Sequence, residues 1–244
     1  MFKTSARVDK KHEDMVRSLP HWHHDFEIAP GLWTKGTYNP EFMLEKLQLP
    51  ADLRGMRILD VGPSDGFFSM TLARRGADVT AVDYRDKDEH GFGVMERVSG
   101  LTFSYHNVNI YEINNRNLGK FDIILFLGVL YHLPDMLRAL HILHGVCRGS
   151  IFVETEGEPD LTPGVATARY YEADTLNGDS SNFWAPNKEC LSALLRDAGF
   201  IAKREEGWGR RLFVEATAGP STHKMAVGYG LVPDNLKLVH QPGA

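Results

Sequence analysis

Short runs of apolar, β-branched and aromatic residues alternate with amphipathic segments through most of the chain. The runs predict strands, and the segments with a period near 3.6 residues predict helices. The predicted strands cover residues 56–61, 78–83, 101–108, 121–127, 150–156, 200–206 and 211–217. The predicted helices cover residues 40–49, 67–75, 135–146 and 188–198. This alternation predicts an α/β fold with a doubly wound, Rossmann-like sheet of seven strands, mostly parallel, that binds ligands across the carboxyl ends of its strands.

The lead-in before this pattern, residues 1–45, has no sustained period but is rich in aromatic residues and histidines. We predict that it forms an N-terminal lid over the ligand end of a domain covering residues 46–217. Within it, Trp22, His23 and His24 are candidates for acceptor binding. No metal site is predicted, because adjacent histidines point in different directions and no acidic or cysteine set completes a ligand group.

Two further segments interrupt the pattern. Residues 157–187 form a long stretch without a sustained period, which is usually functional in a compact domain. We assign this loop to acceptor binding, with Asn182 and Trp184 as candidates. Residues 218–244 are weakly patterned and are expected to be a C-terminal tail.

Composition narrows the range of partners. The chain has 244 residues and a formal net charge of −5, which disfavours a nucleic-acid partner because phosphate binding calls for a basic face. No apolar run approaches the roughly 20 residues needed to cross a membrane. The first residues are charged and lack the apolar core of a signal peptide, so a cytoplasmic location without membrane contact is expected.

The most informative stretch is residues 58–69, Ile-Leu-Asp-Val-Gly-Pro-Ser-Asp-Gly-Phe-Phe-Ser. It predicts a strand, a tight glycine turn and a helix start, a combination that usually holds a nucleotide. Ser64 and Ser69 break the G-x-G-x-x-G spacing, so a dinucleotide pyrophosphate is disfavoured. Asp60 stands where a cationic ligand head would be welcome, as the amino group of S-adenosylmethionine (SAM) would be.

Other strand ends supply the remaining candidates for SAM binding. Asp83 closes the second strand about 20 residues after the turn, where a carboxylate can accept hydrogen bonds from both ribose hydroxyls; the alternative is a helix cap or a solvated aspartate. Asn109 and Ile110, just after the third strand, are candidates for the adenine. The full set of predicted cofactor residues is Asp60, Gly62, Ser64, Gly66, Phe67, Asp83, Tyr84, Asn109, Ile110 and Gly128.

The fourth strand runs into Gly-Val-Leu-Tyr-His-Leu-Pro at residues 128–134. His132 is the candidate general base for a hydroxyl or amine acceptor, since the pKa of an imidazole suits that role. Tyr131 is the second candidate catalytic residue, orienting donor or acceptor; the alternative for the pair is a packed, hydrogen-bonded strand end. Glu154 is also a candidate for acceptor binding, and with Glu156 it is a reserve base; the alternative for both is a solvated strand end.

With these residues in place, the chain resembles the class I SAM-dependent methyltransferases over roughly residues 20–200. Within them it is similar to the branch that includes the tRNA wobble-uridine carboxymethyltransferase. The resemblance implies a seven-stranded methyltransferase sheet with SAM as cofactor. Its motifs are Leu59-Asp60-Val61-Gly62 with Asp65-Gly66-Phe67-Phe68, Gly128-Val129-Leu130-Tyr131-His132, Val153-Glu154-Thr155, and Asn182-Phe183-Trp184 with Pro186-Asn187.

Departures from that branch favour plain SAM and a small acceptor. The branch enzyme uses a basic Lys-Gly-Pro-Phe stretch to hold the extra carboxylate of carboxy-SAM. The matching place here is His23-His24-Asp25-Phe26, without a lysine, although Tyr131 matches the tyrosine that also serves that carboxylate. The chain also lacks most of the longer N-terminal region, so tRNA is the less favoured acceptor.

Two function classes compete with methyl transfer. A nicotinamide-dependent reductase would share the glycine turn and Asp83, but it requires the missing third glycine. A non-catalytic SAM-binding protein would bind SAM and release no S-adenosylhomocysteine. The acidic strand ends and the Tyr131-His132 pair argue against this second class.

Overall fold

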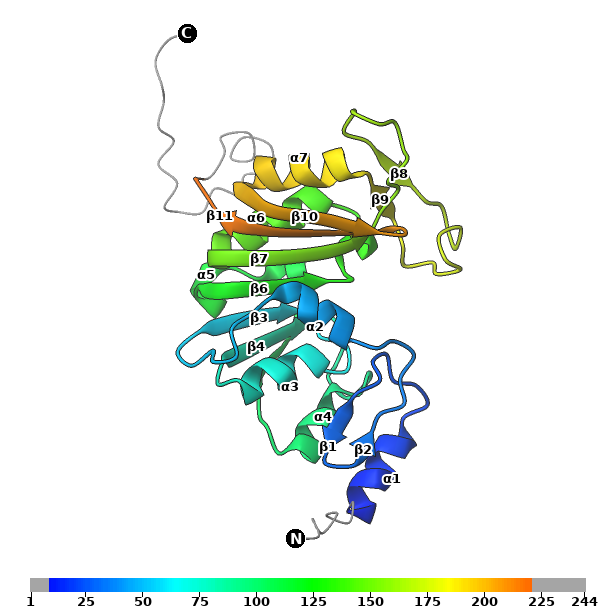
Figure 1. The fold of residues 1–244 in the computed structure, drawn as a ribbon, viewed down its shortest axis with the longest axis vertical. Coiled ribbons are helices and arrows are strands. Elements are labelled where there is room, and N and C mark those ends of the chain that lie inside the picture. The colour runs from blue at the N-terminus through cyan, green and yellow to red at the C-terminus, as the bar shows by residue number, and fades with distance from the viewer. Residues whose placement is uncertain (1–8, 221–244) are drawn as a thin grey trace. The chain divides into compact units, whose positions relative to one another are not determined.

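The structure, a computed structural model, describes residues 9–220. The chain divides into two compact units, Met1–Ile110 and Tyr111–Ala244. Most of the predicted tail, 218–244, lies outside the described residues, as do residues 1–8. Figure 1 labels the elements of both units and colours them from blue to red along the chain.

The first unit contains the lead-in and the glycine turn. Its elements are α1 (Lys10–Ser18), β1 (Glu27–Ala29), β2 (Leu32–Trp33), α2 (Glu41–Leu47), β3 (Arg57–Val61), α3 (Phe67–Arg74), β4 (Asp78–Asp83), α4 (Phe92–Ser99) and β5 (Ser104–Asn107). β4 pairs in parallel with both β3 and β5, so these three strands end at one edge. The lead-in forms a hairpin of β1 and β2, and α1 and β1 pack against α4.

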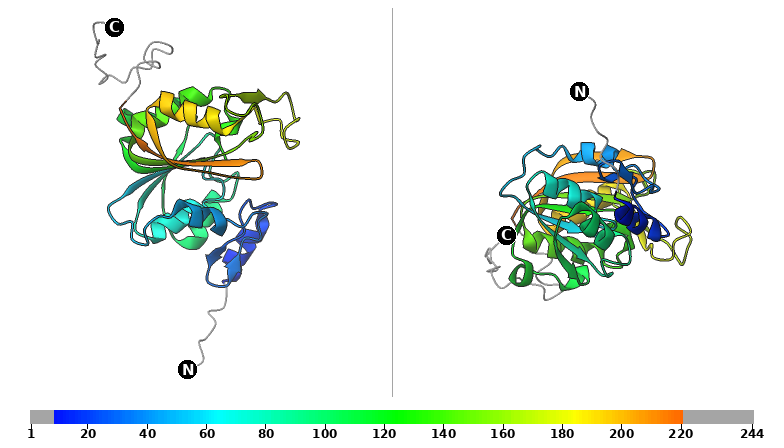
Figure 2. Two further views of the ribbon diagram at one scale, coloured as in Figure 1. Left: turned by 45° about the horizontal axis from the view of Figure 1, so that its top comes forward. Right: turned by 90° about the horizontal axis from the view of Figure 1, so that it is seen from below.

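The short helix η1 (Ile110–Glu112) lies where the two units divide. The elements of the second unit are α5 (Asn115–Leu118), β6 (Phe121–Leu127), η2 (Leu130–His132), α6 (Met136–Val146), β7 (Cys147–Glu156), β8 (Ala168–Tyr170), β9 (Trp184–Pro186), α7 (Lys188–Ala198), β10 (Phe200–Trp208) and β11 (Arg211–Ala218). β6 and β7 are parallel, whereas β11 runs antiparallel to both β7 and β10. Helices α6 and α7 pack against each other, and α7, yellow in Figure 2, packs on β10.

Seven strands form one sheet in the order β10-β11-β7-β6-β3-β4-β5. The predicted α/β fold with a mostly parallel, Rossmann-like sheet of seven strands is confirmed. Helix α7 shows how the sequence sets an element locally. The Asn187 side chain accepts a hydrogen bond from the Cys190 main-chain nitrogen at its start, and Gly199 adopts a φ of 99° at its end. Between these caps, Leu191, Leu195 and Ala198 bury one stripe of the helix.

Some elements differ from the sequence-based prediction. Helix α4 was not predicted, because it is only eight residues long and most of its side chains are buried, which hides the helical period. Strands β8 and β9 lie within the stretch predicted to be a loop, and each has only three residues. Strand β5 is shorter than predicted, four residues long, and β7 begins directly at the end of α6.

Gly66 closes the glycine turn just before α3, and its replacement by alanine tests the packing of the turn. Its φ is +84°, and a Cβ there would overlap with Cε of Met95. Gly66→Ala is expected to lower the free energy of unfolding by about 2–4 kcal/mol, from left-handed strain and overpacking together. The matched control is Gly55→Ala, because Gly55 has a φ of +81° with nothing within 4 Å of the added Cβ. Urea unfolding should show a smaller loss for Gly55→Ala, and equal losses would show that the packing against Met95 does not matter.

Candidate functional site

The glycine turn joins β3 to α3 through residues of positive φ. The φ angles are 71° at Gly62, 53° at Ser64 and 84° at Gly66. The main-chain nitrogen of Gly62 donates a hydrogen bond to the Val82 carbonyl at 2.8 Å, and that of Gly66 donates to the Pro63 carbonyl at 2.9 Å. The backbone is thus folded tightly at the carboxyl end of β3, which is what the spacing of glycines predicts.

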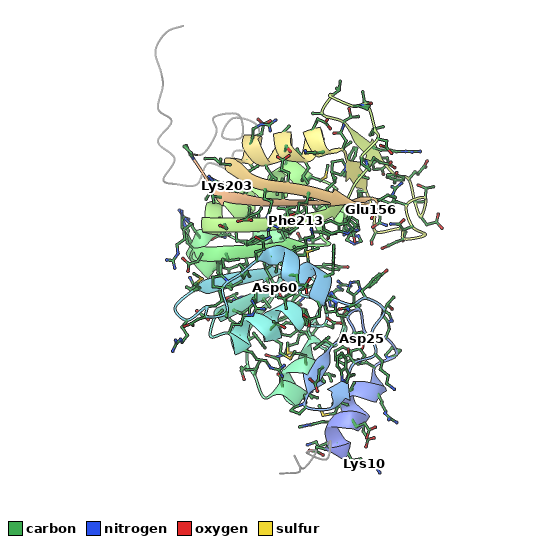
Figure 3. The ribbon with its side chains drawn as sticks, in the orientation of Figure 1. Lys10, Asp25, Asp60, Glu156, Lys203 and Phe213 are labelled. Carbon is green, nitrogen blue, oxygen red and sulfur yellow. The ribbon has the colours of Figure 1, made fainter. Side chains whose placement is uncertain are left out.

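Asp60 is a buried carboxylate directly before this turn. Its Oδ2 accepts a hydrogen bond from Ser69 Oγ at 2.7 Å. Burial raises the pKa of Asp60 to about 6, although the Ser69 hydrogen bond and His24 act in the opposite direction. A buried anion with so little compensation would be stabilised by a cationic ligand group. Asp60, labelled in Figure 3 on β3, is therefore suited to an ammonium group.

Asp83 ends β4 with one oxygen engaged and the other available. Its Oδ1 accepts hydrogen bonds from the Arg85 main-chain nitrogen at 3.0 Å and from Arg85 Nε at 3.5 Å. Among the described residues, none donates to Oδ2. Tyr84 is 67% exposed, and the Arg85 guanidinium lies 5.1 Å from its ring centroid. The Asp83 carboxylate can therefore accept a further hydrogen bond from a ligand hydroxyl.

The adenine candidates follow β5. The Val108 main-chain nitrogen donates to the Asp83 carbonyl at 2.9 Å, which ties the two strand ends together. Asn109 is exposed, whereas Ile110 is buried at the start of η1. Both residues follow the carboxyl end of β5, as predicted from the sequence, and their contact with adenine stays a prediction.

Several candidates from the lead-in and from α3 are packed side chains. Trp22 is buried, and its Nε1 donates to the Val16 carbonyl at 3.0 Å. Phe67 is also buried, with its ring centroid 5.3 Å from that of Phe26. His23 is exposed, and its ring lies 4.8 Å from that of Tyr38. Of these, His23 is the most accessible to an acceptor.

His24 binds a residue that the sequence analysis did not select. Its main-chain nitrogen and its Nδ1 each lie 2.7 Å from an oxygen of Asp65, in the middle of the glycine turn. Asp65 is fully buried. No local signal links the two residues, since they are 41 positions apart in the sequence.

In the second unit, Gly128 turns the chain from β6 into η2. Its φ is 71°, and its main-chain nitrogen donates to the Glu154 carbonyl at 2.9 Å. His132 follows in η2, with Nδ1 3.2 Å from the Ser181 carbonyl and 3.0 Å from Ser181 Oγ. Ser181 Oγ in turn donates to Asp179 Oδ1 at 2.6 Å. A neutral imidazole that donates from Nδ1 carries its basic lone pair on Nε2.

Tyr131 is held by two elements of the second unit. Its carbonyl accepts a hydrogen bond from the Phe183 main-chain nitrogen at 2.8 Å. The Arg211 guanidinium lies 5.0 Å from its ring centroid, a cation–π contact. Burial raises the pKa of the Tyr131 hydroxyl, although Arg211 opposes that effect. Tyr131 is thus a neutral, fixed side chain at neutral pH.

The loop candidates Asn182 and Trp184 have different hydrogen-bond partners. Trp184 Nε1 donates to the Pro134 carbonyl at 3.1 Å. Asn182 is 4% exposed, and its Nδ2 donates to the Leu176 carbonyl at 2.8 Å. Its Oδ1 is buried without a hydrogen-bond partner among the described residues. A buried amide oxygen of this kind calls for a donor.

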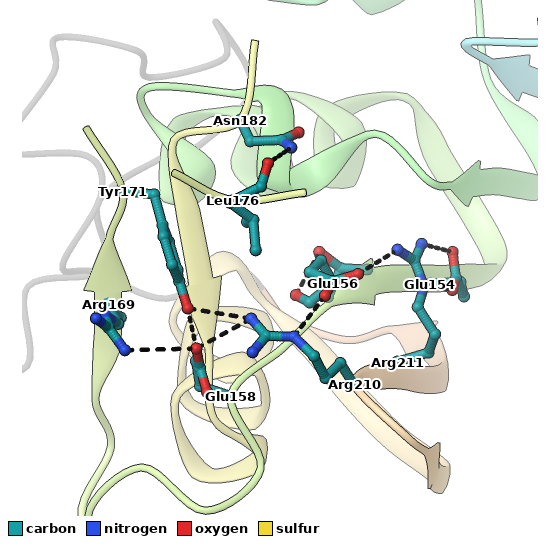
Figure 4. A network of polar contacts seen from close by, with 10 residues as sticks. Glu154, Glu156, Glu158, Arg169, Tyr171, Leu176, Asn182, Arg210 and Arg211 are labelled. Atoms are coloured by element: carbon teal, nitrogen blue, oxygen red, sulfur yellow. Dashed lines mark hydrogen bonds and ion pairs between the residues drawn. The ribbon is translucent and has the colours of Figure 1, made fainter. Parts of the chain in front are cut away.

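An alternating row of carboxylates and guanidiniums joins β7 to the β10–β11 hairpin (Figure 4). Arg211 binds Glu154 through two hydrogen bonds and Glu156 through one of 2.8 Å. Arg210 binds Glu156 at 2.8 Å and Glu158 at 3.0 Å. Burial alone would lower the pKa of Arg211, but its pairing with Glu154 raises the pKa overall. Glu154 and Glu156 are therefore paired, which makes either a poor reserve base.

Within residues 9–220, no three histidine, cysteine or acidic side chains gather as a metal ligand set. Over the same residues, no helix has the length and apolar character to cross a bilayer. The sequence analysis did not select Asp65, Ser181 or Arg211 as site residues, because each binds a side chain from a remote segment. The only signal in the sequence is that each carries a polar or charged side chain.

Sequence comparisons agree on one kind of domain. A family profile described as "Methyltransferase domain" matches residues 36–201. The "Ubiquinone biosynthesis O-methyltransferase" of Bordetella avium is 34% identical over 136 residues, covering 54% of this chain and 54% of that protein. The protein of the same description from Pseudomonas syringae pv. tomato is 28% identical over 206 residues, covering 81% and 86%. The chain spans about half the length of the first curated relatives that it matches, 54% and 46%.

Solved structures share the fold at low sequence identity. The N-terminal domain of EvdMO1 with S-adenosylhomocysteine bound has a TM-score of 0.65 and 18% identity, covering 89% of this chain and 99% of that chain. The 1,6-didemethyltoxoflavin-N1-methyltransferase of Burkholderia thailandensis has a TM-score of 0.54 and 20% identity, covering 68% and 72%. At these identities the likeness establishes the fold.

Proposed function

Since the chain belongs to the methyltransferase-domain family, we propose that it transfers a methyl group from SAM to an oxygen or nitrogen atom of a small-molecule acceptor. Family membership confirms the coarser part of the resemblance, the class I SAM-dependent methyltransferases. The observation that carries the proposal is the buried Asp60 carboxylate at the glycine turn, whose raised pKa marks a site that favours a cation.

The residues present fit SAM. Asp60 would hold the amino group of its methionine part, and the Oδ2 of Asp83 is available to a ribose hydroxyl. Asn109 and Ile110 would flank the adenine. When bound, SAM supplies a methyl group already activated by the sulfonium.

The protein's remaining task is to align the acceptor and to take its proton. In the proposed step, the acceptor oxygen or nitrogen forms a bond to the methyl carbon while the carbon–sulfur bond breaks. The electron pair of that bond stays on sulfur, and S-adenosylhomocysteine leaves. His132 Nε2 takes the proton from the acceptor's O–H or N–H, with Nδ1 held against Ser181.

The side chain of Asn182 favours a methyl acceptor that carries a hydrogen-bond donor. Its buried Oδ1 has no partner among the described residues, and its chain neighbours bind the Tyr131-His132 turn, Ser181 through His132 and Phe183 through Tyr131. A hydroxyl or amino group of the acceptor would satisfy this oxygen. We propose as acceptor a small molecule with O–H or N–H groups.

Transfer from carboxy-SAM to a tRNA wobble uridine is the alternative. It would need a cation for the extra carboxylate, and Tyr131 matches that branch. The cation beside Tyr131 is Arg211, which already binds Glu154 and Glu156. A guanidinium that already binds two carboxylates attracts a third one only weakly. This supports plain SAM, which lacks the extra carboxylate, as the methyl donor.

The test is competitive binding followed by turnover. Native mass spectrometry with SAM, carboxy-SAM and NAD should show retention of SAM. Screening phenolic, hydroxylated and amine acceptors should then give a mass gain of one methyl group and S-adenosylhomocysteine. Preference for carboxy-SAM with a mass gain on tRNA would overturn the proposal, as would retention of NAD with reductase activity. Retention of SAM without product from any acceptor would indicate the non-catalytic class.

The affinity for SAM is expected to depend on pH through Asp60. In the free protein this carboxyl titrates at about pH 6, and only its ionised form attracts an ammonium group. Lowering the pH from 7 to 5 should therefore weaken SAM binding about tenfold, measured by isothermal titration calorimetry. Asp60→Asn is expected to bind weakly and without this dependence. An equal dependence in Asp60→Asn would assign the titration to another group.

A further inference from the structure

The lead-in is attached to the glycine turn through one residue pair. Asp65 accepts a hydrogen bond on Oδ2 from the His24 main-chain nitrogen and one on Oδ1 from His24 Nδ1, both at 2.7 Å. Because a carboxylate only accepts, Nδ1 carries the proton in this arrangement. The Asp65 side chain has no solvent exposure, and the His24 side chain has 13%. The one acidic side chain of the turn, that of Asp65, therefore binds the lead-in and is shielded from solvent.

Among the described residues, no other donor reaches the Asp65 carboxylate. Without the His24 side chain, Oδ1 of this fully buried carboxylate would lose its donor, and only the main-chain nitrogen of residue 24 would still bind Oδ2. A buried carboxylate oxygen without a donor destabilises the fold far more than an exposed one does. The turn is then expected to move so that water can reach Asp65. The conformation of the turn thus depends on residue 24.

The lead-in is in turn built around His24. Thr34 Oγ1 donates to the His24 carbonyl at 2.7 Å, and a Cβ at Gly36 would overlap with that same carbonyl. The Asp25 main-chain nitrogen donates to the Tyr38 carbonyl at 2.8 Å. The His24 ring also lies 5.9 Å from the ring of Phe67 at the start of α3. Residues 22–38 therefore dock on the turn as one folded segment.

From this geometry we propose that His24 and Asp65 are positioning residues for SAM. By fixing the glycine turn, the pair couples the docking of residues 22–38 to the binding of SAM. This inference rests on the proposed function, and it moves His24 from acceptor binding to cofactor positioning. Coupling is reciprocal, so bound SAM should also hold the segment in place.

The first test compares two replacements of His24 that differ in whether the side chain can donate a hydrogen bond to Asp65. His24→Asn keeps a nitrogen donor near the position of Nδ1, whereas His24→Leu removes it. His24→Leu is expected to raise the Kd for SAM about 10- to 100-fold, and His24→Asn to stay close to the wild type. Where turnover is measured, KM for SAM should rise more than kcat falls. His21→Leu is the matched control, since His21 is an exposed histidine of the same run.

The second test uses the unaltered protein. Amide hydrogen exchange of His24, Asp25 and Thr34 should slow when SAM is added, and Asp65→Asn should lose this slowing. Wild-type affinity in His24→Leu would overturn the proposal. If that variant does not fold, unchanged exchange in the wild type with SAM bound would overturn it instead. Failure of the wild type to bind SAM would refute the proposed function, which is a separate result.

Discussion

Replacing Arg211 by methionine is expected to lower the free energy of unfolding by about 3–5 kcal/mol. Arg211 binds two carboxylates that are nearly inaccessible, Glu154 at 6% exposure and Glu156 at 5%. Methionine keeps much of the apolar volume but removes the charge and the donors. Glu154 then stays buried without its counter-ion, which costs more than the lost attraction alone. Equilibrium urea unfolding of the variant measures the effect.

The control for this variant is Arg148→Met. Arg148 also makes a two-bond pair with a carboxylate, Asp122, at 2.8 Å for each bond, but the pair is exposed. Exposed pairs are screened by water, so little change in stability is expected. Arg210→Met should fall between the two, because Glu156 would keep Arg211. Similar losses in Arg148→Met and Arg211→Met would show that burial does not set the cost.

Replacing His132 by alanine is expected to lower kcat by about 10²- to 10⁴-fold while leaving the Kd for SAM unchanged. The imidazole is the proposed base, whereas the side chains proposed to hold SAM, those of Asp60, Asp83, Asn109 and Ile110, lie in the first unit. Single-turnover methyl transfer with saturating SAM and acceptor measures the rate, and calorimetry measures SAM binding. Loss of the acidic limb of the pH–rate profile in the variant would further identify His132 as the base, since a base must be deprotonated to act.

Ser181→Ala provides the matched comparison for His132. It removes the hydroxyl 3.0 Å from Nδ1 but keeps the Ser181 carbonyl that also faces this nitrogen. A smaller fall in kcat is therefore expected, with SAM binding again unchanged. If His132→Ala instead weakens SAM binding and turnover equally, the residue is structural, and the base must be sought elsewhere.

The His24–Asp65 and Arg211–Glu154 pairs share one physical feature. In each, a buried carboxylate is satisfied by a side chain from a remote segment: Asp65 by His24, and Glu154 by Arg211. Buried anions need such partners, and the need fixes where the remote segment must lie. The lead-in and the β10–β11 hairpin are thus both held by hydrogen bonds to buried carboxylates as well as by packing.

Several features could be predicted from the sequence because they depend on near neighbours. The run 78–83 forms β4 and 121–127 forms β6 as predicted, since β-branched and apolar residues bounded by turn residues specify a strand locally. Helix α7 also has its predicted bounds, because its caps and its apolar stripe lie within a dozen residues. The glycine turn and Asp60 follow from the same short-range chemistry.

Only the tertiary structure decided which side chains meet. His24 was predicted to bind the acceptor, and the fold places it on Asp65, 41 positions away. Arg211 was not selected at all, and it pairs with Glu154 across 57 positions and lies over Tyr131. Strand register brings such residues together, and register depends on contacts between distant segments that no local pattern records. The sequence by itself therefore determined the kind of fold and the kind of cofactor, while the partners of each buried charge were decided by the folded chain.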